Sequence, residues 1–193
     1  MNFQSPVHLT AELAHGMAEL GMPNSYIVAP ARGLDYQALH GYWSAVEAAG
    51  LLDLRFPEKP VADLNKFVAE RRLQDHEYYV IHCGSGQLVG EFSLENFMGK
   101  AAQVHFSMHP DNEPSFNVEL ASCVADQLLY QWKDFRDLSR TFLDTLLGLT
   151  PIPNRAACIF VLRAGFEKLG VLPSSMNYLG EVVDTMVSVR VRH

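Results

Sequence analysis

Cysteine is scarce in this chain of 193 residues. The three cysteines, Cys83, Cys123 and Cys158, are odd in number and include no CxxC pair. An odd count without that spacing argues against a disulfide framework and against a zinc cluster. Each cysteine lies in an apolar run, which is typical of a buried thiol in a reducing compartment. We therefore expect a cytoplasmic protein that is stabilised by packing and not by covalent crosslinks.

The sequence also lacks any uninterrupted apolar run of the ~20 residues that a membrane-spanning helix needs. Its start does not combine a basic segment with an apolar core, as a secretory signal would. The formal net charge is −7. Nucleic acid and anionic membranes would be repelled by that charge, so neither is expected as a partner.

The apolar pattern that is present changes its period along the chain. Helical spacing predicts helices over residues 9–20, 36–50, 60–72, 115–135 and 154–164. Alternation and turn residues predict strands over 25–30, 76–84, 87–96, 101–109 and 178–192. Residues 136–150 are compatible with more helix or with a fifth strand near 145–150, which would begin at Phe142 or near Leu147. This order predicts an α/β (α+β) fold over residues 25–193, with a mixed, largely antiparallel sheet, after an N-terminal helical extension over residues 1–24.

The stretch from Gly148 to Gly170 is the most informative one. Asn154 is placed to cap a short apolar helix, because its side chain can accept a hydrogen bond from a first-turn amide. The helix should end where Gly165 precedes Phe166. A cap of this kind stabilises a helix by ~1 kcal/mol, and it is compatible with a ligand contact by the same residue.

These residues resemble the GNAT superfamily of acyl-CoA-dependent N-acetyltransferases. In that family a helix begins at an asparagine after a strand and runs to a Gly-Phe pair, as Asn154 and Gly165-Phe166 do here. Gly180 and Asp184 also fit the common ending of family members. The resemblance implies a central sheet flanked by helices on both faces, with acetyl-CoA as co-substrate and an amine as acceptor.

The resemblance also implies which residues bind the cofactor. Strand 101–109 resembles the family's fourth strand, whose backbone lines the pantetheine arm. The asparagine would donate a hydrogen bond to that arm, and the apolar helix behind it would form the wall of the groove. The implied cofactor-binding residues are Phe106, Ser107, Met108, Asn154, Ala157 and Phe160.

Attack of an amine on a thioester needs a base and an acid, for which the candidates are Glu91, His105 and Tyr178. Glu91 would serve as a base if it were half buried, but the alternation of its strand favours a solvent-facing position. His105 carries an imidazole that can exchange a proton near neutral pH, although a partly buried, hydrogen-bonded place on the sheet is the favoured explanation. Tyr178 would protonate the thiolate. No metal is expected, because His105 and His109 would lie ~13 Å apart along one strand.

The sequence departs from the family pattern after strand 101–109. The family has a glycine-rich loop there, whose helix start holds a pyrophosphate with free N–H groups. This chain reads HPDNEPSFNVE at residues 109–119, without glycine. Residues 101–132 contain no Lys or Arg and four acids: Asp111, Glu113, Glu119 and Asp126. Acids near the start of a helix stabilise its dipole and would repel a phosphate.

Two functions therefore stay open at the level of sequence. The first is a GNAT-type N-acetyltransferase that moves an acetyl group from acetyl-CoA to an amine of a protein or small molecule, with a lean to cationic acceptors. The second is a non-catalytic GNAT-fold binding or assembly protein, of the kind associated with phages or prophages, that has lost acyl-CoA binding. A homodimer is compatible with both.

Overall fold

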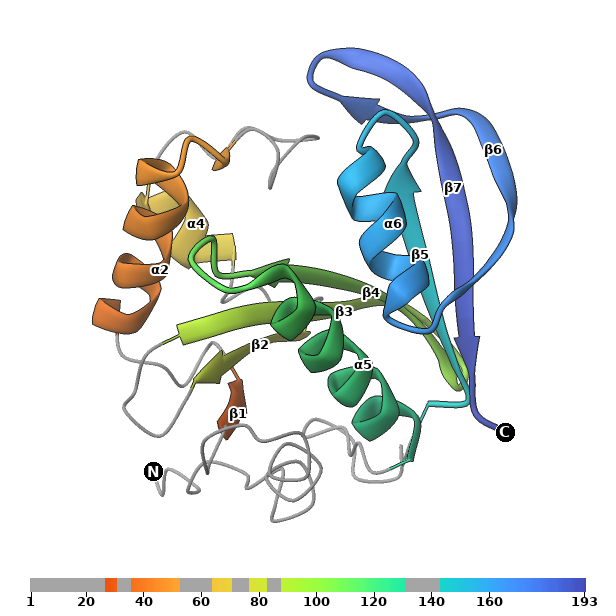
Figure 1. Ribbon diagram of the computed structural model, residues 1–193, viewed down its shortest axis with the longest axis horizontal. Coiled ribbons are helices and arrows are strands. Elements are labelled where there is room, and N and C mark those ends of the chain that lie inside the picture. Colours follow the sequence, from red (N-terminus) through yellow and green to blue (C-terminus); the bar gives the residue numbers. More distant parts are fainter. Residues whose placement is uncertain (1–26, 31–35, 53–63, 71–76, 83–87, 131–142) are drawn as a thin grey trace. The chain divides into compact units, whose positions relative to one another are not determined.

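The computed structural model describes residues 27–30, 36–52, 64–70, 77–82, 88–130 and 143–193 (Figure 1). The predicted helix 9–20, and with it the boundary at residue 24, lies outside these residues. Within them no helix combines the length and the apolar character needed to cross a membrane. The chain divides into two compact units: a first unit of Met1–Leu52, Val61–Ser93 and Phe106–Asn112, and a second unit of Asp53–Pro60, Leu94–His105 and Glu113–His193.

The first unit contains two short strands and two helices. They are β1 (Ile27–Pro30), α2 (Tyr36–Ala48), α4 (Leu64–Glu70) and β2 (Glu77–His82). β1 and β2 pair antiparallel, with Ile27 opposite His82. α2 buries Trp43 and Val46, the apolar pair that its helical spacing brings to one face. All four elements fall within the ranges predicted from the sequence.

Two longer strands each contribute residues to both units. β3 (Leu88–Met98) and β4 (Ala101–Met108) are joined by a turn at Gly99, whose φ of 61° suits glycine. The six consecutive residues 89–94 of β3 are all buried. β3 is therefore covered on both faces there, so one-sided alternation does not apply to it.

The second unit holds the rest of the sheet. Its elements are α5 (Pro114–Tyr130), β5 (Thr145–Pro151), α6 (Arg155–Arg163), β6 (Glu167–Tyr178) and β7 (Glu181–Val191). β4 and β5 run parallel, whereas β5 and β6 both pair antiparallel with β7. The strands pair in the order β1-β2-β3-β4-β5-β7-β6. The predicted class, a mixed α/β fold with a largely antiparallel sheet, is confirmed.

β6 has no counterpart among the predicted strands, and this omission is a correction to the sequence analysis. Its residues are exposed almost throughout, so it shows no apolar alternation. Pro173 lies in its middle, and Ser174 has a φ of 45°. The register with β7 shifts between Leu172 and Met176, which shows how a strand accommodates this turn-like segment as a bulge.

One arginine joins three elements of the second unit. The guanidinium of Arg190 on β7 donates to the Ala164 carbonyl at 2.6 Å, to Ser122 Oγ at 3.0 Å and to Asp126 Oδ1 at 2.6 Å. The side chain is only 16% exposed. Because Ser122 and Asp126 belong to α5 and Ala164 ends α6, Arg190 ties both helices to the sheet.

We predict that Gly148→Ala destabilises the second unit. A Cβ at Gly148 would lie 2.5 Å from Ser188 Oγ, which is fully buried, and 3.5 Å from Val161. Overpacking of this kind costs about 1–3 kcal/mol, which urea denaturation would detect. The added change Ser188→Ala should restore much of the loss. Gly41→Ala in α2, where a Cβ meets nothing within 4 Å, is the control and should not destabilise. Equal stability of Gly148→Ala and the parent chain would contradict the packing described.

Candidate functional site

The parallel pairing of β4 with β5 ends early. It comprises the pairs Ala101↔Thr145, Ala102↔Leu146 and Gln103↔Leu147. β5 continues for four residues to Pro151, and β4 continues through Val104 and His105 within the same unit. In the described part of the chain, no pair between β4 and β5 follows Gln103↔Leu147. Past this point β5 stays paired with β7, and the Gly148 carbonyl accepts a hydrogen bond from Ser188. The facing edges of β4 and β5, which are not paired with each other there, suit an extended ligand with amide groups.

β5 leads directly into a capped helix. Asn154 is the N-cap of α6, and its Oδ1 accepts a hydrogen bond from the Ala157 N–H at 3.1 Å. The first helical bond runs from Cys158 N–H to the Asn154 carbonyl at 3.0 Å. Within the described residues Asn154 Nδ2 makes no hydrogen bond. The predicted cap is thus confirmed, and one amide donor is left for a ligand.

α6 ends as its sequence predicts. The Gly165 N–H donates to the Leu162 carbonyl at 3.1 Å, and the Phe166 N–H donates to the Val161 carbonyl at 3.2 Å. Gly165 has a φ of 87°, and Phe166 is 3% exposed. These two bonds, with a left-handed glycine between them, form a Schellman motif that turns the aromatic ring back into the core.

His105 lies two residues past the last β4–β5 pair. Its Nε2 is 2.5 Å from Glu95 Oε1 and 2.6 Å from the side-chain amide of Gln103, which in turn accepts a hydrogen bond from Asn96 at 2.9 Å. The side chain of His105 is 40% exposed. Its hydrogen-bonded, partly buried place on the sheet is therefore confirmed. Glu95 accepts a hydrogen bond from a protonated Nε2, whereas the Gln103 amide nitrogen donates to an unprotonated Nε2, so the two contacts belong to different tautomers of His105.

Glu95 was missed in the sequence analysis. The turn at Gly99 sets the register of a hairpin, and the contact between Asn96 and Gln103 puts residues 94–96 opposite 103–105. Regular alternation in that register would place Glu95 opposite Val104, on the other face from His105. Asn96 has a φ of 51°, which interrupts the regular strand next to Glu95, so the turn alone did not predict the contact with His105.

The predicted solvent-facing position of Glu91 is wrong. Glu91 is 4% exposed, because β3 is covered on both faces over residues 89–94. Alternation predicts exposure only for a strand with one solvated face, and β3 does not have one.

The other predicted site residues are divided between the units. Phe106, Ser107 and Met108 belong to the first unit, where the ring of Phe106 packs against Phe92 with 6.3 Å between centroids. Tyr178 belongs to the second unit, where it ends β6 opposite Glu181 on β7 and is 7% exposed. Asn154, Ala157 and Phe160 share α6.

The loop before α5 offers few backbone donors. The Asp111 N–H donates to His109 Nδ1 at 3.3 Å, and the Asn112 N–H donates to the His109 carbonyl at 3.2 Å. Pro110 and Pro114 have no N–H to offer. The side chain of Asp111 is 83% exposed. Two backbone N–H groups of this segment are used internally and its two prolines have none, so the segment offers few donors with which to bind an anion.

α6 also carries a partly buried thiol, Cys158. Burial raises the pKa of this thiol above its ordinary value, and the nearby Lys168 ammonium partly offsets that rise. The Cys158 thiol lies 3.8 Å from the Pro151 carbonyl, to which it donates a weak hydrogen bond. Burial also raises the pKa of Cys123 on α5, where Asp126 and Glu119 add to the effect.

No protein-family model matches this sequence, and no curated protein matches it. Solved structures do share its architecture. RimL, the ribosomal L7/L12 alpha-N-protein acetyltransferase, aligns with a TM-score of 0.68 and 12% identity over 88% of this chain and 92% of its own. The spermidine N-acetyltransferase of Vibrio cholerae, solved with CoA and spermine, aligns with a TM-score of 0.63 and 14% identity over 86% and 95%.

A third structure, an acetyltransferase of the GNAT family from Bacillus anthracis, aligns with a TM-score of 0.64 and 12% identity over 86% of this chain and 94% of its own. The same architecture therefore recurs in three acetyltransferases at low sequence identity.

We predict that the reactivity of Cys158 depends on the charge of Lys168. Without that ammonium the pKa of the thiol should rise further, because a nearby cation favours the thiolate. Lys168→Gln should therefore slow alkylation of Cys158 by iodoacetamide at pH 8.5, as followed by peptide mass spectrometry. Arg163→Gln, which removes one charge from the same helix, should leave the rate unchanged. A faster reaction in Lys168→Gln would reverse the predicted sign.

The chain has the fold of the GNAT acetyltransferases, as the structural comparisons show. The early end of β4–β5 pairing and the capped helix after β5 are consistent with that fold.

Proposed function

We propose that this protein is a GNAT-type N-acetyltransferase that transfers an acetyl group from acetyl-CoA to an amine. The observation that carries the proposal is the parallel β4–β5 pair that ends at Gln103↔Leu147, followed by the N-cap Asn154 where α6 begins. An acyl-CoA arm is extended and contains amides, so it pairs with unoccupied strand backbone. The free Nδ2 of Asn154 supplies a further donor to the arm.

The rest of the proposed cofactor site rests on the family resemblance. Ala157 and Phe160 lie on one flank of α6 and would form the wall beside the arm. Phe106, Ser107 and Met108 are included in the proposal on the family resemblance alone, in which the backbone of this strand lines the arm. Acetyl-CoA itself is part of the proposal, and CoA is bound in the similar spermidine N-acetyltransferase.

The proposed reaction is direct attack. The amine nitrogen forms a bond to the thioester carbonyl carbon, the C–S bond breaks, and the thiolate leaves. His105 is the favoured base: in the tautomer whose Nε2–H donates to Glu95, Nδ1 is the nitrogen that would take the amine proton. Glu91 is the alternative base, and Tyr178 is the proposed acid that protonates the thiolate.

The acceptor is proposed to be an amine, and a cationic amine is preferred. The net charge of −7 would attract a polyamine or a basic protein N-terminus. The structurally similar proteins include one solved with spermine and one named for acetylation of a ribosomal protein. A cytoplasmic location and a homodimer stay predictions.

A specific observation favours the second function, a GNAT-fold binding module without acyl-CoA. The loop at residues 109–112 uses its amides internally, and Glu113 and Glu119 on the second unit are exposed. Coenzyme A carries several phosphate charges, which exposed acids repel. Loss of the phosphate cradle with retention of the fold is the expected pattern for a protein that no longer uses the cofactor.

Binding of acetyl-CoA separates the two functions. An enzyme should gain ~2.7 kcal/mol of stability from cofactor at 100 times its Kd, measured as a rise in melting temperature. ATP, which has the nucleotide and polyphosphate but no thioester arm, is the control and should shift the transition less. Thiol release in the presence of spermine should then fall by about 10²–10⁴ in His105→Gln. An unchanged transition at saturating acetyl-CoA would leave the binding module as the function.

Variants of Asn154 separate the cap from the ligand contact. Asn154→Ser keeps a capping oxygen and removes the amide donor, so stability should change little while acetyl-CoA binding weakens several-fold. Asn154→Ala removes both and should also lose ~1 kcal/mol of stability. Urea denaturation and calorimetric titration measure the two effects independently. Unchanged affinity in Asn154→Ser would restrict this residue to its capping role.

A further inference from the structure

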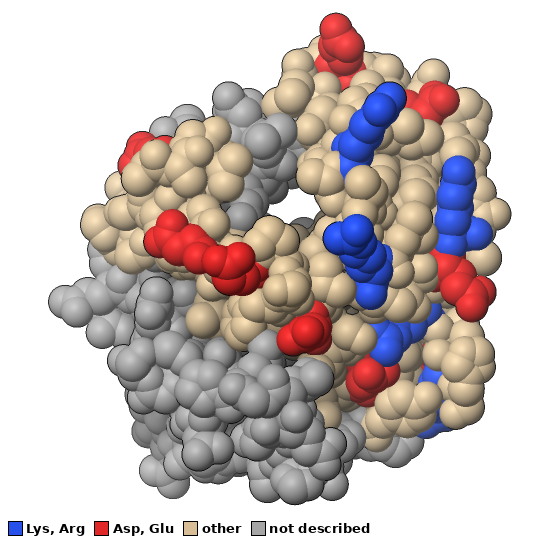
Figure 2. All heavy atoms as spheres, viewed as in Figure 1, with Lys and Arg blue, Asp and Glu red and all other residues tan. Residues whose placement is uncertain are grey.

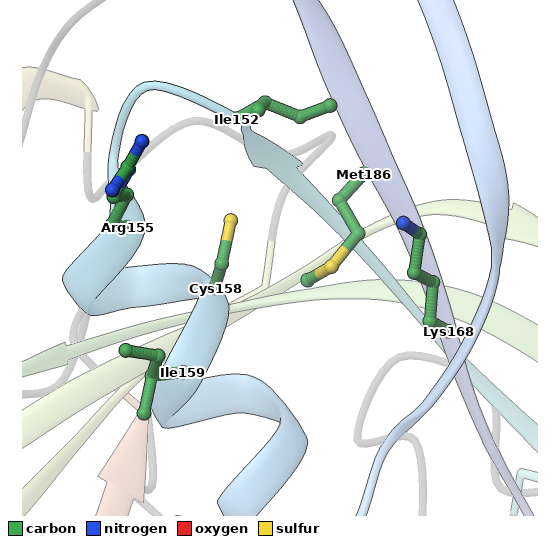
Figure 3. Close-up of a pocket in the computed structure, with 6 residues that line it drawn as sticks. All are labelled: Ile152, Arg155, Cys158, Ile159, Lys168 and Met186. Atoms are coloured by element: carbon green, nitrogen blue, oxygen red, sulfur yellow. The ribbon is translucent and has the colours of Figure 1, made fainter.

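A separate hollow lies on the second unit, between α6 and the β6–β7 strands. Its volume is about 300 Å³, which is at the lower end of the range for small-molecule sites. Its wall is mainly apolar, with two cations and one thiol. The lining residues are Ile152, Arg155, Cys158, Ile159, Lys168 and Met186 (Figure 3).

The hollow lies on the opposite flank of α6 from the residues proposed to line the acyl arm. Successive residues of a helix are turned by ~100° about its axis. Arg155, Cys158 and Ile159 therefore project from one side, while Ala157 and Phe160 project from the other. Figure 3 shows the sulfur of Cys158 and the side chain of Met186 turned toward the space between α6 and β7. This site is distinct from the proposed cofactor site.

The two cations of the hollow have no acidic partner among the described residues. Arg155 and Lys168 are exposed, and neither side chain makes a hydrogen bond or an ion pair with any residue that the structure describes. By contrast, Arg190 pairs with Asp126, at 2.6 Å. Lys100 and Arg192 both pair with Asp144, at 3.8 Å and 2.6 Å.

Figure 2 shows basic side chains spread over α6 and the β6–β7 strands. Glu167, the acid next to Lys168 in the sequence, leaves β6 on the other face, because successive residues of a strand alternate. A chain with a net charge of −7 thus has, at an apolar hollow, two cations that no described residue neutralises. That combination is typical of a site for an anion with an apolar body.

We propose that this hollow binds a small carboxylate with an apolar tail. The guanidinium of Arg155 matches a carboxylate with two parallel N–H donors, and the Lys168 ammonium adds a second positive charge. Arg155 is also the first residue of α6, where the helix dipole favours an anion. Ile152, Ile159 and Met186 would bury the tail, because apolar surface removed from water contributes about 25 cal/mol per Å².

The thiol of Cys158 provides a reporter inside the site. A ligand in the hollow would cover Cys158 and slow its alkylation, whereas Cys123 on α5 is not part of the lining. The full chain is treated with iodoacetamide, and the rate at each cysteine is followed by peptide mass spectrometry. Octanoate is the probe. Octylamine has the same tail with the opposite charge, and acetate has the same head without the tail.

Octanoate is expected to slow alkylation of Cys158 by tenfold or more at saturation and to leave Cys123 unchanged, while octylamine and acetate protect little. Arg155→Gln and Lys168→Gln should each raise, by roughly tenfold, the octanoate concentration that gives half of the full protection, because each removes a charge-assisted contact. Arg163→Gln, on the same helix but outside the lining, should not. Protection is scored as the ratio of rates with and without octanoate in each variant, because Lys168→Gln alters the thiol itself.

Three results would overturn the proposal: no protection by octanoate, equal protection by octylamine, or equal weakening in Arg163→Gln. The first shows that the hollow is unoccupied by this class, the second that only its apolar wall binds, and the third that the effect is one of net charge. Arg155 is exposed, so Arg155→Gln tests the site even if Lys168→Gln fails to fold. Because acetyl-CoA binding is measured separately, either proposal can fail without the other.

Discussion

The hydrogen bonds of Arg190 are the constraint on which the second unit depends most. A single guanidinium fixes the C-terminal end of α6, one face of α5 and the strand β7. A partly buried arginine is costly unless its donors are satisfied, and here they are used on the Ala164 carbonyl, the Ser122 side chain and the Asp126 carboxylate. Gly165 belongs to the same constraint, because a Cβ there would lie 3.1 Å from the guanidinium. With its end held in this way, α6 has a defined direction, and so does each residue on its two flanks.

The two flanks of α6 explain why one short helix serves two proposals. The N-cap Asn154 follows β5 past its last pair with β4, and this early end of pairing would expose strand backbone to the proposed acyl arm. The other flank faces the β6–β7 strands, where the sheet ends with apolar side chains and with cations that no described residue pairs. Both sites depend on β5, because the strand leads into the helix and supplies Ile152 just beyond its end. The helix is therefore a shared wall and not a part of one site alone.

Sequence reasoning succeeded where the signals are local. The helix from Asn154 to Ala164 was predicted with its cap and its glycine stop, because capping and Schellman geometry depend on residues within one turn. It failed where burial is decided by distant segments. Glu91 was expected to face solvent, yet β3 is covered on both faces, a property of the sheet and not of the strand. β6 was missed because its pairing with β7 tolerates Pro173 as a bulge. The hollow beside Cys158 could not be predicted from the sequence for the same reason. Lys168 and Met186 line it from two different strands, and no local pattern sets the register between those strands.

The described charges suit the acyl arm of the cofactor better than its nucleotide. Backbone groups on β4 and β5 and the amide of Asn154 are neutral, so they can hold a pantetheine arm without any cation. Phosphates need either amides or cations, and the loop at 109–112 provides few free amides while residues 101–132 provide no Lys or Arg. Arg155 and Lys168, cations without an ion pair among the described residues, belong instead to the other flank of α6. If acetyl-CoA binds, its affinity must come mainly from the arm, and a truncated pantetheine thioester should then retain most of the binding free energy that the full cofactor has.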